Sequence, residues 1–281
     1  MPTPILVAVA LVAFAANSVL TRAAIDPARA QIDPASFTAL RLAAGAACLA
    51  ALIVLRGGRL NLRAASPASA AALFLYAAPF SFAYVALDAG LGALILFGAV
   101  QTGMFAGALR GGERPSPARW AGAAAGLAGL AWIALPGAAA PPLVPSLLMA
   151  FAGLAWAVFS LRGRGSVAPT EDMGRAFVLC APAAALLLLT GAPSEATSTG
   201  VALAVASGAL ASGAGYAVWY AALPRLDASL AAVAQLTVPL IALAGGIAFL
   251  DEAASPRFWP AAALILGGVA AATLIPARRA N

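Results

Sequence analysis

The chain lacks histidine and lysine and contains two cysteines. There is no His among its 281 residues, and all 16 basic residues are Arg. The missing imidazole excludes Ser–His–Asp triads, histidine proton relays and histidine metal sites. Cys48 and Cys180 both lie inside apolar stretches, so we interpret them as small core residues and not as a disulfide. We therefore expect no cofactor and no bound metal.

Charge of either sign is also scarce. Charged residues make up 9% of the chain and hydrophobic residues 63%, and the mean hydropathy is +0.96. Soluble domains carry about 25% charged residues, so this composition predicts a polytopic membrane protein. The basic pI does not indicate a nucleic-acid partner here, because the Arg residues sit almost entirely between apolar segments.

No acidic residue lies at the centre of an apolar segment. All ten Asp and Glu residues are at or near expected loops. Carriers coupled to protons or sodium commonly use an intramembrane carboxylate. Its absence predicts that a substrate would move down its own gradient.

Long apolar segments are what the chain does contain. A membrane-spanning helix needs about 20 mostly apolar residues, and we expect an all-α protein with ten such helices. The first lacks a basic leading region, so we interpret it as a span and not as a signal peptide. The ten segments are 4–21, 34–55, 68–87, 91–110, 117–136, 144–161, 174–190, 200–223, 228–250 and 257–276.

The sequence repeats at an offset of 139 residues. Nine of the 33 positions from Asp88 to Trp120 are identical to those from Asp227 to Trp259. The less common matches are Asp88/Asp227, Glu113/Glu252, Ser116/Ser255, Pro117/Pro256 and Trp120/Trp259. We therefore expect two repeats of five helices, residues 1–140 and 141–281, within one membrane domain. An odd number of helices per repeat inverts the second copy, as in secondary transporters; duplication for folding alone is the alternative.

The Arg residues predict the orientation. If the N-terminus is inside, twelve Arg lie in cytoplasmic segments and three outside, with Arg41 inside a helix. The positive-inside rule then places both termini in the cytoplasm. In a bacterium this membrane would be the inner membrane.

Arg41 is the exceptional charge within the apolar segments. It lies about 10 Å along its helix from the outer end, at 1.5 Å per residue, where a cation usually faces a cavity or a partner. One interpretation is a counter-charge for a substrate carboxylate. The other is a snorkelling Arg, or one paired with Asp33 or Asp88.

Aromatic and polar side chains at helical spacing complete the candidate site. The aromatic stripes face either a central cavity or the membrane interface, and the amide side chains either substrate or neighbouring helices. We assign Trp120 and Trp259 to the interface. The candidate substrate-binding residues are Asn17, Ser18, Arg41, Tyr76, Phe80, Tyr84, Gln101, Trp156, Ser160, Tyr216, Trp219, Tyr220, Gln235 and Pro239.

Taken in order, these motifs resemble the drug/metabolite transporter superfamily, specifically its EamA-type members. The motifs are a turn Glu with Pro four residues later (Glu113 and Glu252), Arg41 after Asp33-Pro34-Ala-Ser-Phe, and Ala-Trp156-Ala. The first copy departs from the pattern, with Val100 at the position that matches Pro239. The branch nearest in length is that of bacterial amino-acid exporters of the YddG kind.

The resemblance implies efflux of amino acids or similar small metabolites across the inner membrane by alternating access. The expected partners are the small-molecule substrate and the lipid bilayer, and we favour a monomer. Multidrug efflux or transport of another metabolite is the alternative. An integral-membrane enzyme is disfavoured, because the chain has neither His nor an acid pair within an apolar segment.

Overall fold

The computed structural model describes residues 1–29, 31–134, 141–189, 196–253, 256 and 258–274. All regular secondary structure in these ranges is helical. The α-helices are α1 (Thr3–Ile25), α2 (Pro34–Leu55), α3 (Pro67–Ala83), α4 (Ala89–Arg110), α5 (Pro117–Ala134), α6 (Leu143–Gly163), α7 (Pro169–Leu187), α8 (Ser198–Ala206), α9 (Gly215–Ala222), α10 (Ala228–Ala234), α11 (Val238–Leu250) and α12 (Phe258–Leu274). Three 3₁₀ turns are η1 (Leu62–Ala64), η3 (Leu223–Arg225) and η4 (Gln235–Thr237), and a π-helix is η2 (Ser207–Ala214).

Proline and capping side chains explain where several helices begin. Pro34, Pro67 and Pro169 occupy the first turns of their helices, where the missing N–H costs nothing. The Asp33 carboxylate accepts hydrogen bonds from the N–H groups of the second and third residues of α2. Such caps satisfy donors that no helical carbonyl can reach.

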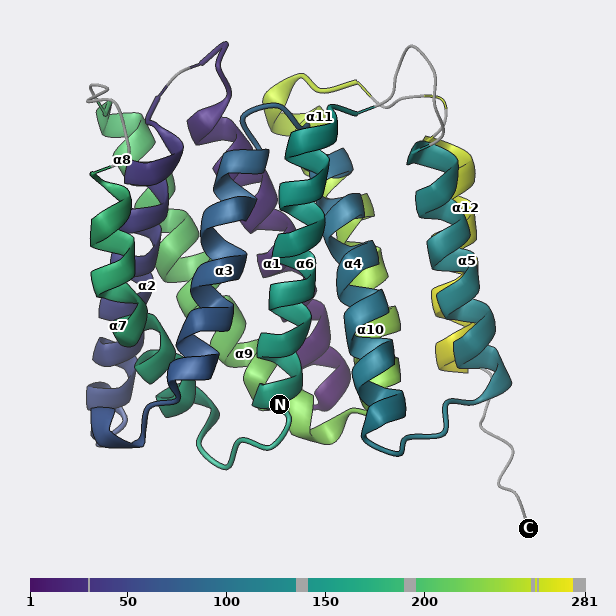
Figure 1. Ribbon diagram of the computed structural model, residues 1–281, viewed down its shortest axis with the longest axis horizontal. Helices are drawn as coiled ribbons and strands as arrows, with labels where there is room; N and C mark the ends of the chain where they lie inside the picture. Colours follow the sequence, from purple (N-terminus) through teal and green to yellow (C-terminus); the bar gives the residue numbers. More distant parts are fainter. Residues whose placement is uncertain (30, 135–140, 190–195, 254–255, 257, 275–281) are drawn as a thin grey trace.

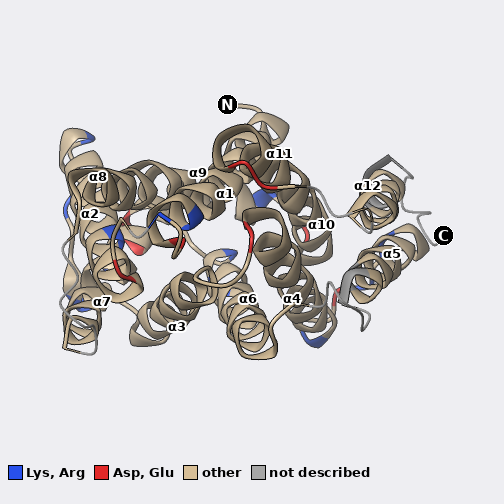
Figure 2. Cartoon of the chain, turned by 90° about the horizontal axis from the view of Figure 1, so that it is seen from above, with Lys and Arg blue, Asp and Glu red and all other residues tan. Residues whose placement is uncertain are grey.

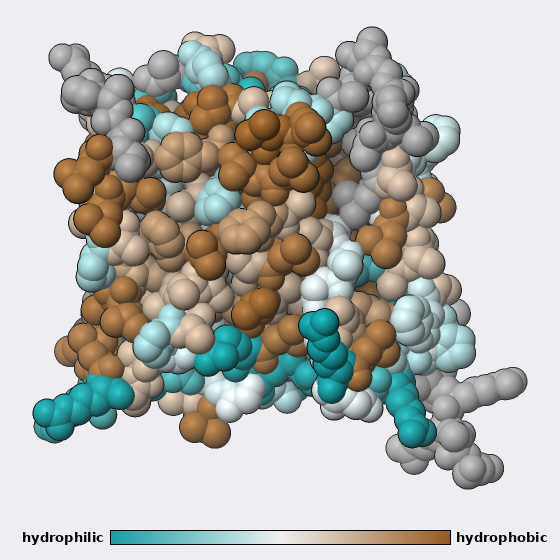
Figure 3. All heavy atoms as spheres, in the orientation of Figure 1, coloured by the Kyte–Doolittle hydropathy of each residue, from teal (hydrophilic) through white to brown (hydrophobic). Residues whose placement is uncertain are grey.

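Six helical runs in the described part of the chain are long and apolar enough to cross a membrane. They are Thr3–Ile25, Pro34–Leu55, Ala89–Arg110, Leu143–Gly163, Ser198–Arg225 and Ala228–Leu250, and shorter apolar helices lie beside them. Figure 3 shows hydrophobic residues across the middle of one face, with hydrophilic residues along the edge where α1 begins. The molecule is an integral membrane protein.

Two segments expected as uninterrupted helices are irregular. Within the expected helix 200–223, Ser207–Ala214 is a π-helix, which packs against α2. Within 228–250, a 3₁₀ turn at Gln235–Thr237 separates α10 from α11. Pro239 accounts for the second break, because it has no N–H to donate to a carbonyl one turn earlier.

The helices run roughly antiparallel, and α12 ends at the face where α1 begins (Figure 1). Helix α1 packs on α9 and α11, whereas α6 packs on α3 and α4. Helices α5 and α12 form a pair at one end of the molecule (Figure 2).

Glycines at helical spacing allow close approach within this single chain. A Cβ at Gly103 would meet the Cβ of Ala157 on α6 at 2.7 Å. One at Gly129 would meet the backbone oxygen of Ala261 on α12 at 3.1 Å. These small-residue faces are therefore occupied by helix–helix contacts inside the protomer.

Candidate functional site

Aromatic rings from both halves of the chain meet at the centre of the bundle. Phe14 of α1 makes edge contacts with Trp156 and Trp219 at centroid distances of 5.3 and 5.4 Å. Tyr216 lies 4.6 Å from Trp156 and 6.3 Å from Tyr76. All five rings are buried. Edge and tilted arrangements of this kind are favoured by the ring quadrupole.

Asn17 is the polar centre of this aromatic cluster. Its amide nitrogen donates to the hydroxyls of Tyr76 and Tyr216 at 3.2 and 2.9 Å, and those hydroxyls lie 2.8 Å apart. Its amide oxygen accepts from Ser207 of the π-helix at 2.5 Å. The network joins α1 and α3 to η2 and α9, so the polar stripes from the two halves converge here.

Arg41 is fully buried beside the same cluster, with 1% of its surface exposed. One terminal nitrogen donates to the Ala77 carbonyl at 3.0 Å. The guanidinium carbon lies 5.0 Å from the Phe80 ring centroid and 5.7 Å from that of Tyr76. The other terminal nitrogen, Nη1, has no hydrogen-bond partner. Neither snorkelling nor pairing with Asp88 describes this side chain, since Asp88 pairs with Arg22.

Two indole N–H groups link α6 to other helices of the second half. Trp156 donates to the Gln235 amide oxygen at 3.0 Å, and Trp219 donates to the Ser160 hydroxyl at 3.3 Å. Pro239 is buried in the first turn of α11, one turn beyond Gln235. These bonds satisfy ring N–H groups that would otherwise be buried without acceptors.

Other candidate residues lie at the margins of the cluster. Tyr84 stacks edge-on against Phe80 at 4.8 Å and donates to the Ala89 carbonyl at 3.2 Å. Tyr220 donates to the Phe159 carbonyl at 2.9 Å and borders a pocket of about 350 Å³ that also involves Arg162. The Ser18 hydroxyl is buried without a hydrogen-bond partner.

Gln101 lies apart from the aromatic cluster. Its amide faces α5, where a Cβ at Gly126 would meet the amide oxygen at 2.6 Å. Both of its amide atoms are buried and have no hydrogen-bond partner. The contacts of Gln101 therefore join helices and do not connect to Arg41 or Asn17.

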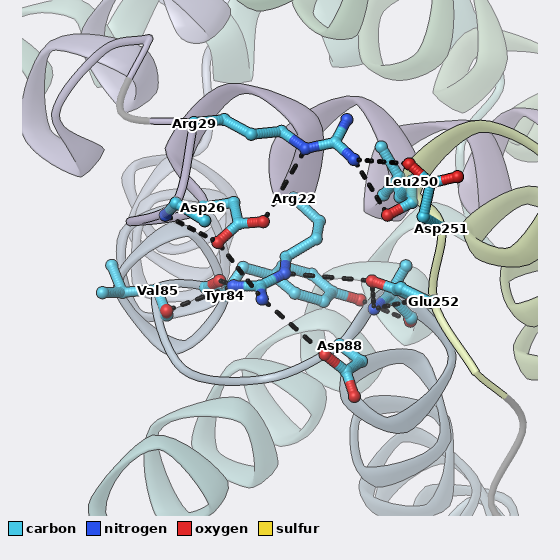
Figure 4. Close-up of polar contacts among 11 residues, drawn as sticks. Arg22, Asp26, Arg29, Tyr84, Val85, Asp88, Leu250, Asp251 and Glu252 are labelled. Carbon is cyan, nitrogen blue, oxygen red and sulfur yellow. Dashed lines mark hydrogen bonds and ion pairs between the residues drawn. The ribbon is translucent and has the colours of Figure 1, made fainter.

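A cluster of carboxylates and arginines joins the two halves of the chain at one face of the bundle (Figure 4). Glu252, just after α11, accepts hydrogen bonds from the Ala89 N–H at 2.9 and 3.1 Å through its two oxygens. Arg22 lies 3.8 Å from Glu252 and 3.7 Å from Asp88, and donates to the carbonyls of Tyr84 and Val85. A residue of the second half thus caps α4 of the first half.

Beside this cluster, further charged residues complete the same surface. Asp26 pairs with Arg22 at 3.4 Å and with Arg29 at 3.9 Å. Arg29 also lies 3.5 Å from the exposed carboxylate of Asp251. Four carboxylates, those of Asp26, Asp88, Asp251 and Glu252, therefore share two arginines, Arg22 and Arg29, and the cluster has an excess of negative formal charge.

A matching cluster lies near the end of α4. Glu113 accepts from the backbone N–H groups of Ala228 and Ser229, at 3.0 and 3.3 Å, and from the Ser229 hydroxyl. Arg119 lies 3.4 Å from Glu113 and 2.7 Å from Asp227. Here a residue of the first half caps α10 of the second half.

The chain is similar in sequence to known proteins. Residues 144–274 match the model of the EamA-like transporter family. A Pseudomonas aeruginosa protein named "Uncharacterized protein PA1977" is 48% identical over 274 residues, covering 95% of this chain and 93% of that protein. The chain belongs to the EamA-like transporter family. Members of this family are transporters and not enzymes.

A solved structure agrees with the fold of this EamA-like chain. It is named only "Crystal structure of protein" and superposes with a TM-score of 0.74 at 24% sequence identity. The similarity covers 97% of this chain and 99% of that one. The whole EamA-like chain therefore shares one known helical architecture.

The two glutamates were identified from the sequence as repeat motifs, but they were not included in the candidate site. In each case a left-handed residue precedes the Glu: Gly112 at φ 78° and Asp251 at φ 59°. These two positions are 139 residues apart, as are the glutamates. Recurrence of the same turn and the same acid is the signal that would have identified both caps in this EamA-like transporter.

Burial changes the acidity of one of these caps. Loss of solvent raises the pKa of Glu252 above its ordinary value. The Ala89 N–H and Arg22 lower the pKa, and Asp88 raises it further. The closed cluster therefore binds a proton on Glu252 more tightly than a solvated carboxylate does.

Proposed function

We propose that this EamA-like chain is a secondary transporter that exports amino acids or similar small metabolites by alternating access. Ten membrane spans form two inverted repeats, residues 1–140 and 141–281. The substrate occupies the region between the repeats at mid-membrane, where such carriers usually bind it.

The packing partners support the proposed repeat relation. If α1 corresponds to α6, and α4 to the run α10–α11, then the contact of α1 with α11 corresponds to that of α6 with α4. Likewise, the contact of α1 with α9 corresponds to that of α6 with α3. The α2–α7 and α5–α12 pairs each map onto themselves. This exchange is what two inverted copies would produce.

The observation that carries the proposal is the pair of reciprocal glutamate caps. The α4–α5 and α11–α12 connections lie at opposite faces (Figure 1), and each supplies the Glu that caps a helix of the other half. A carrier needs one closure on each side of its site, and the two must open in turn. The caps supply one such closure at each face, and both are formed in this structure.

The Arg residues support an orientation with the start of α1 in the cytoplasm of a bacterial inner membrane. Arg56, Arg110, Arg162 and Arg225 all lie at or beyond helix ends on the face where α1 begins. Basic residues flanking spans remain on the cytoplasmic side. The Glu113 cap is then the inner closure and the Glu252 cap the outer one.

The substrate-binding assignment rests on the central cluster. Asn17, Arg41, Tyr76, Phe80, Trp156 and Tyr216 combine apolar ring surface with a few polar groups, as small-molecule sites usually do. A fixed cation in this cluster disfavours cationic drugs as substrates. A guanidinium does not titrate in the physiological range, so we propose transport down the electrochemical gradient of the substrate.

Counterflow in proteoliposomes tests the transport function. Vesicles that contain purified protein are loaded with an unlabelled substrate, and uptake of the labelled compound is followed against protein-free vesicles. We expect transient accumulation for at least one amino acid or related metabolite. Trp219→Ala should reduce it at least tenfold per folded protein, and loss of this fully buried ring should also lower the melting temperature, so uptake is normalised to folded protein. Uptake equal to that of empty vesicles across the panel contradicts the proposal.

A further inference from the structure

The buried charge of Arg41 has no counter-charge in the described structure. The carboxylates that form ion pairs do so elsewhere: Asp26, Asp88 and Glu252 with Arg22, Asp251 with Arg29, Glu113 and Asp227 with Arg119, and Asp172 with Arg175. No ion pair within 4.0 Å reaches Arg41 in the described ranges. The Arg41 guanidinium, which is 1% exposed, is therefore buried without a carboxylate partner in the described ranges.

Its present contacts compensate only part of the cost of burial. A guanidinium has five N–H donors, and here one terminal nitrogen bonds a single carbonyl, that of Ala77. The rings of Phe37, Tyr76 and Phe80 supply cation–π attraction, which is weaker than an ion pair with full hydrogen bonding. Because Nη1 has no acceptor, the guanidinium can bond a further group, and an anion would both accept this hydrogen bond and neutralise the charge.

An irregular segment next to Arg41 provides a second, independent indication of a ligand. The π-helix Ser207–Ala214 packs on α2, and a Cβ at Gly208 would collide with the Arg41 carbonyl. Ser212 in the same segment has a buried hydroxyl without a hydrogen-bond partner. Single π-helical turns inside α-helices occur frequently at functional sites. A second unpaired buried polar group therefore lies on the segment that packs against α2.

We propose that Arg41 binds the anionic group of a monocarboxylate whose body is aromatic or apolar, and that the net charge of the site selects against zwitterions. This inference rests on the proposed transport function and narrows its substrates to those similar small metabolites that carry a carboxylate but no ammonium group, which excludes amino acids. The carboxylate would pair with the guanidinium, while the body would lie among the rings of the central cluster. No described carboxylate is available there to neutralise the ammonium group of an amino acid, so an uncompensated amine is penalised.

The proposal has an electrical consequence. Because the substrate crosses as an anion and Arg41 remains part of the protein, each substrate molecule carries one net negative charge across the membrane. A membrane potential that is negative inside then drives the anion outward. Export of such a substrate needs no titrating group within the spans.

A set of three compounds with similar phenyl–alkyl bodies tests the selectivity for charge. 3-Phenylpropionate is an anion, phenylalanine a zwitterion and phenethylamine a cation. Their effect on the melting temperature of the detergent-purified protein is measured at pH 7. We expect only 3-phenylpropionate to raise it, and the shift to disappear in Arg41→Gln. If that variant fails to fold, the wild-type comparison still decides. An equal shift with phenylalanine, or none with 3-phenylpropionate, overturns the proposal.

Inorganic anions distinguish a substrate site from a structural ion site. Sodium chloride and sodium sulfate are compared with sodium gluconate at equal ionic strength. We expect chloride and sulfate to leave the shift produced by 3-phenylpropionate nearly unchanged. If chloride alone gives the full shift, Arg41 holds a structural ion and the substrate assignment is wrong.

Transport current separates failure of this inference from failure of the proposed function. Proteoliposomes on a solid-supported membrane receive a concentration jump of 3-phenylpropionate or of phenylalanine. We expect a transient negative charge displacement for the anion alone. Electroneutral flux of phenylalanine without transport of the anion overturns this inference but leaves the transport function standing. Binding of the anion without flux or current contradicts the transport function.

Discussion

Two glutamates act as helix caps across the boundary between the halves of the chain. The Glu252 side chain is 7% exposed and satisfies the Ala89 N–H at the start of α4. Loss of one partner leaves a buried donor without an acceptor, which costs about 1–3 kcal/mol. Loss of either cap can therefore change the equilibrium constant between the closed and open states of its face by a large factor.

Removal of the outer cap is expected to open the outer face. In a background without Cys48 and Cys180, a cysteine at the buried position Leu87 reports access to water. Glu252→Ala should raise its rate of modification by an impermeant maleimide about 5- to 150-fold, given about 1–3 kcal/mol for a buried donor left without an acceptor.

Asp251→Asn is the matched control for Glu252→Ala. The carboxylate of Asp251 is 99% exposed, and Asn tolerates its left-handed backbone. We expect no more than a twofold change in the modification rate. An equal change in both variants would show that the cap is not the closure.

The raised pKa of Glu252 predicts a pH dependence of opening. The closed face binds the proton more tightly than the open one, so closure is favoured below the ordinary carboxyl pKa. This contribution is lost as pH rises through the raised pKa. The modification rate at position 87, corrected for thiol ionisation with an exposed cysteine at Thr197, should increase over that interval.

Glu252→Gln keeps a hydrogen-bond acceptor but cannot titrate, so it should remain closed with a flat pH profile. Asp88 and Asp26 remain in that variant, and a pH dependence that persists would assign the titration to them. A profile that falls with rising pH in the wild-type protein would contradict the sign derived from burial.

At the residue scale, sequence and structure agree where a residue is unusual within its own helix. Arg41 is a charge inside an apolar segment, and Tyr76 and Tyr216 lie in aromatic stripes, so each could be identified locally. Ser207 is an ordinary residue of an apolar sequence. Its role depends on contacts with distant helices, which hydropathy and spacing do not encode.

The elements show which features of a helix the sequence specifies. The expected starts of the second and third helices agree with α2 and α3, which begin at Pro34 and Pro67. The expected start at 174 is wrong for α7, which begins at Pro169, and the break before α11 at Pro239 was not predicted. The π-helix at Ser207–Ala214 was not predicted. Its composition of Ser, Gly, Ala and Leu suits an α-helix equally well, and its geometry depends on packing against α2.

Close packing of α4 and α6 is expected to tolerate no added methyl group at Gly153. A Cβ there would collide with the Leu96 carbonyl and lie 2.8 Å from Ala99. Overpacking of this kind costs about 1–3 kcal/mol, so Gly153→Ala should lower the midpoint of thermal unfolding by several degrees. Gly267→Ala is the control, because nothing lies within 4 Å of its added Cβ. Equal midpoints for both variants would refute the α4–α6 contact.

For the molecule as a whole, the sequence predicted the class of protein. Apolar segments, Arg-rich connections and a 139-residue repeat identified a helical membrane transporter before any contact was known. They could not predict how the halves meet. Glu113 and Glu252 each cap a helix that begins more than 100 residues away in the sequence. Hydropathy and spacing do not show which distant residues come into contact in the folded chain.

Orientation is tested by labelling two exposed positions. Arg59 and Thr197 lie in connections on opposite faces. In the background without native cysteines, Thr197→Cys should react with an impermeant maleimide in intact cells, and Arg59→Cys only after the membrane is permeabilised. The reverse pattern would invert the topology.

Two reciprocal caps are expected to close the two faces alternately. Double electron–electron resonance in nanodiscs measures both faces, with spin-label pairs at Ala86 and Ala253 for the outer cap and at Arg114 and Arg225 for the inner cap. Glu252→Ala should lengthen the outer distance while the inner distance stays short, and Glu113→Ala should do the opposite. If either variant lengthens both distances at once, or if neither changes its own pair, the caps are not alternating closures.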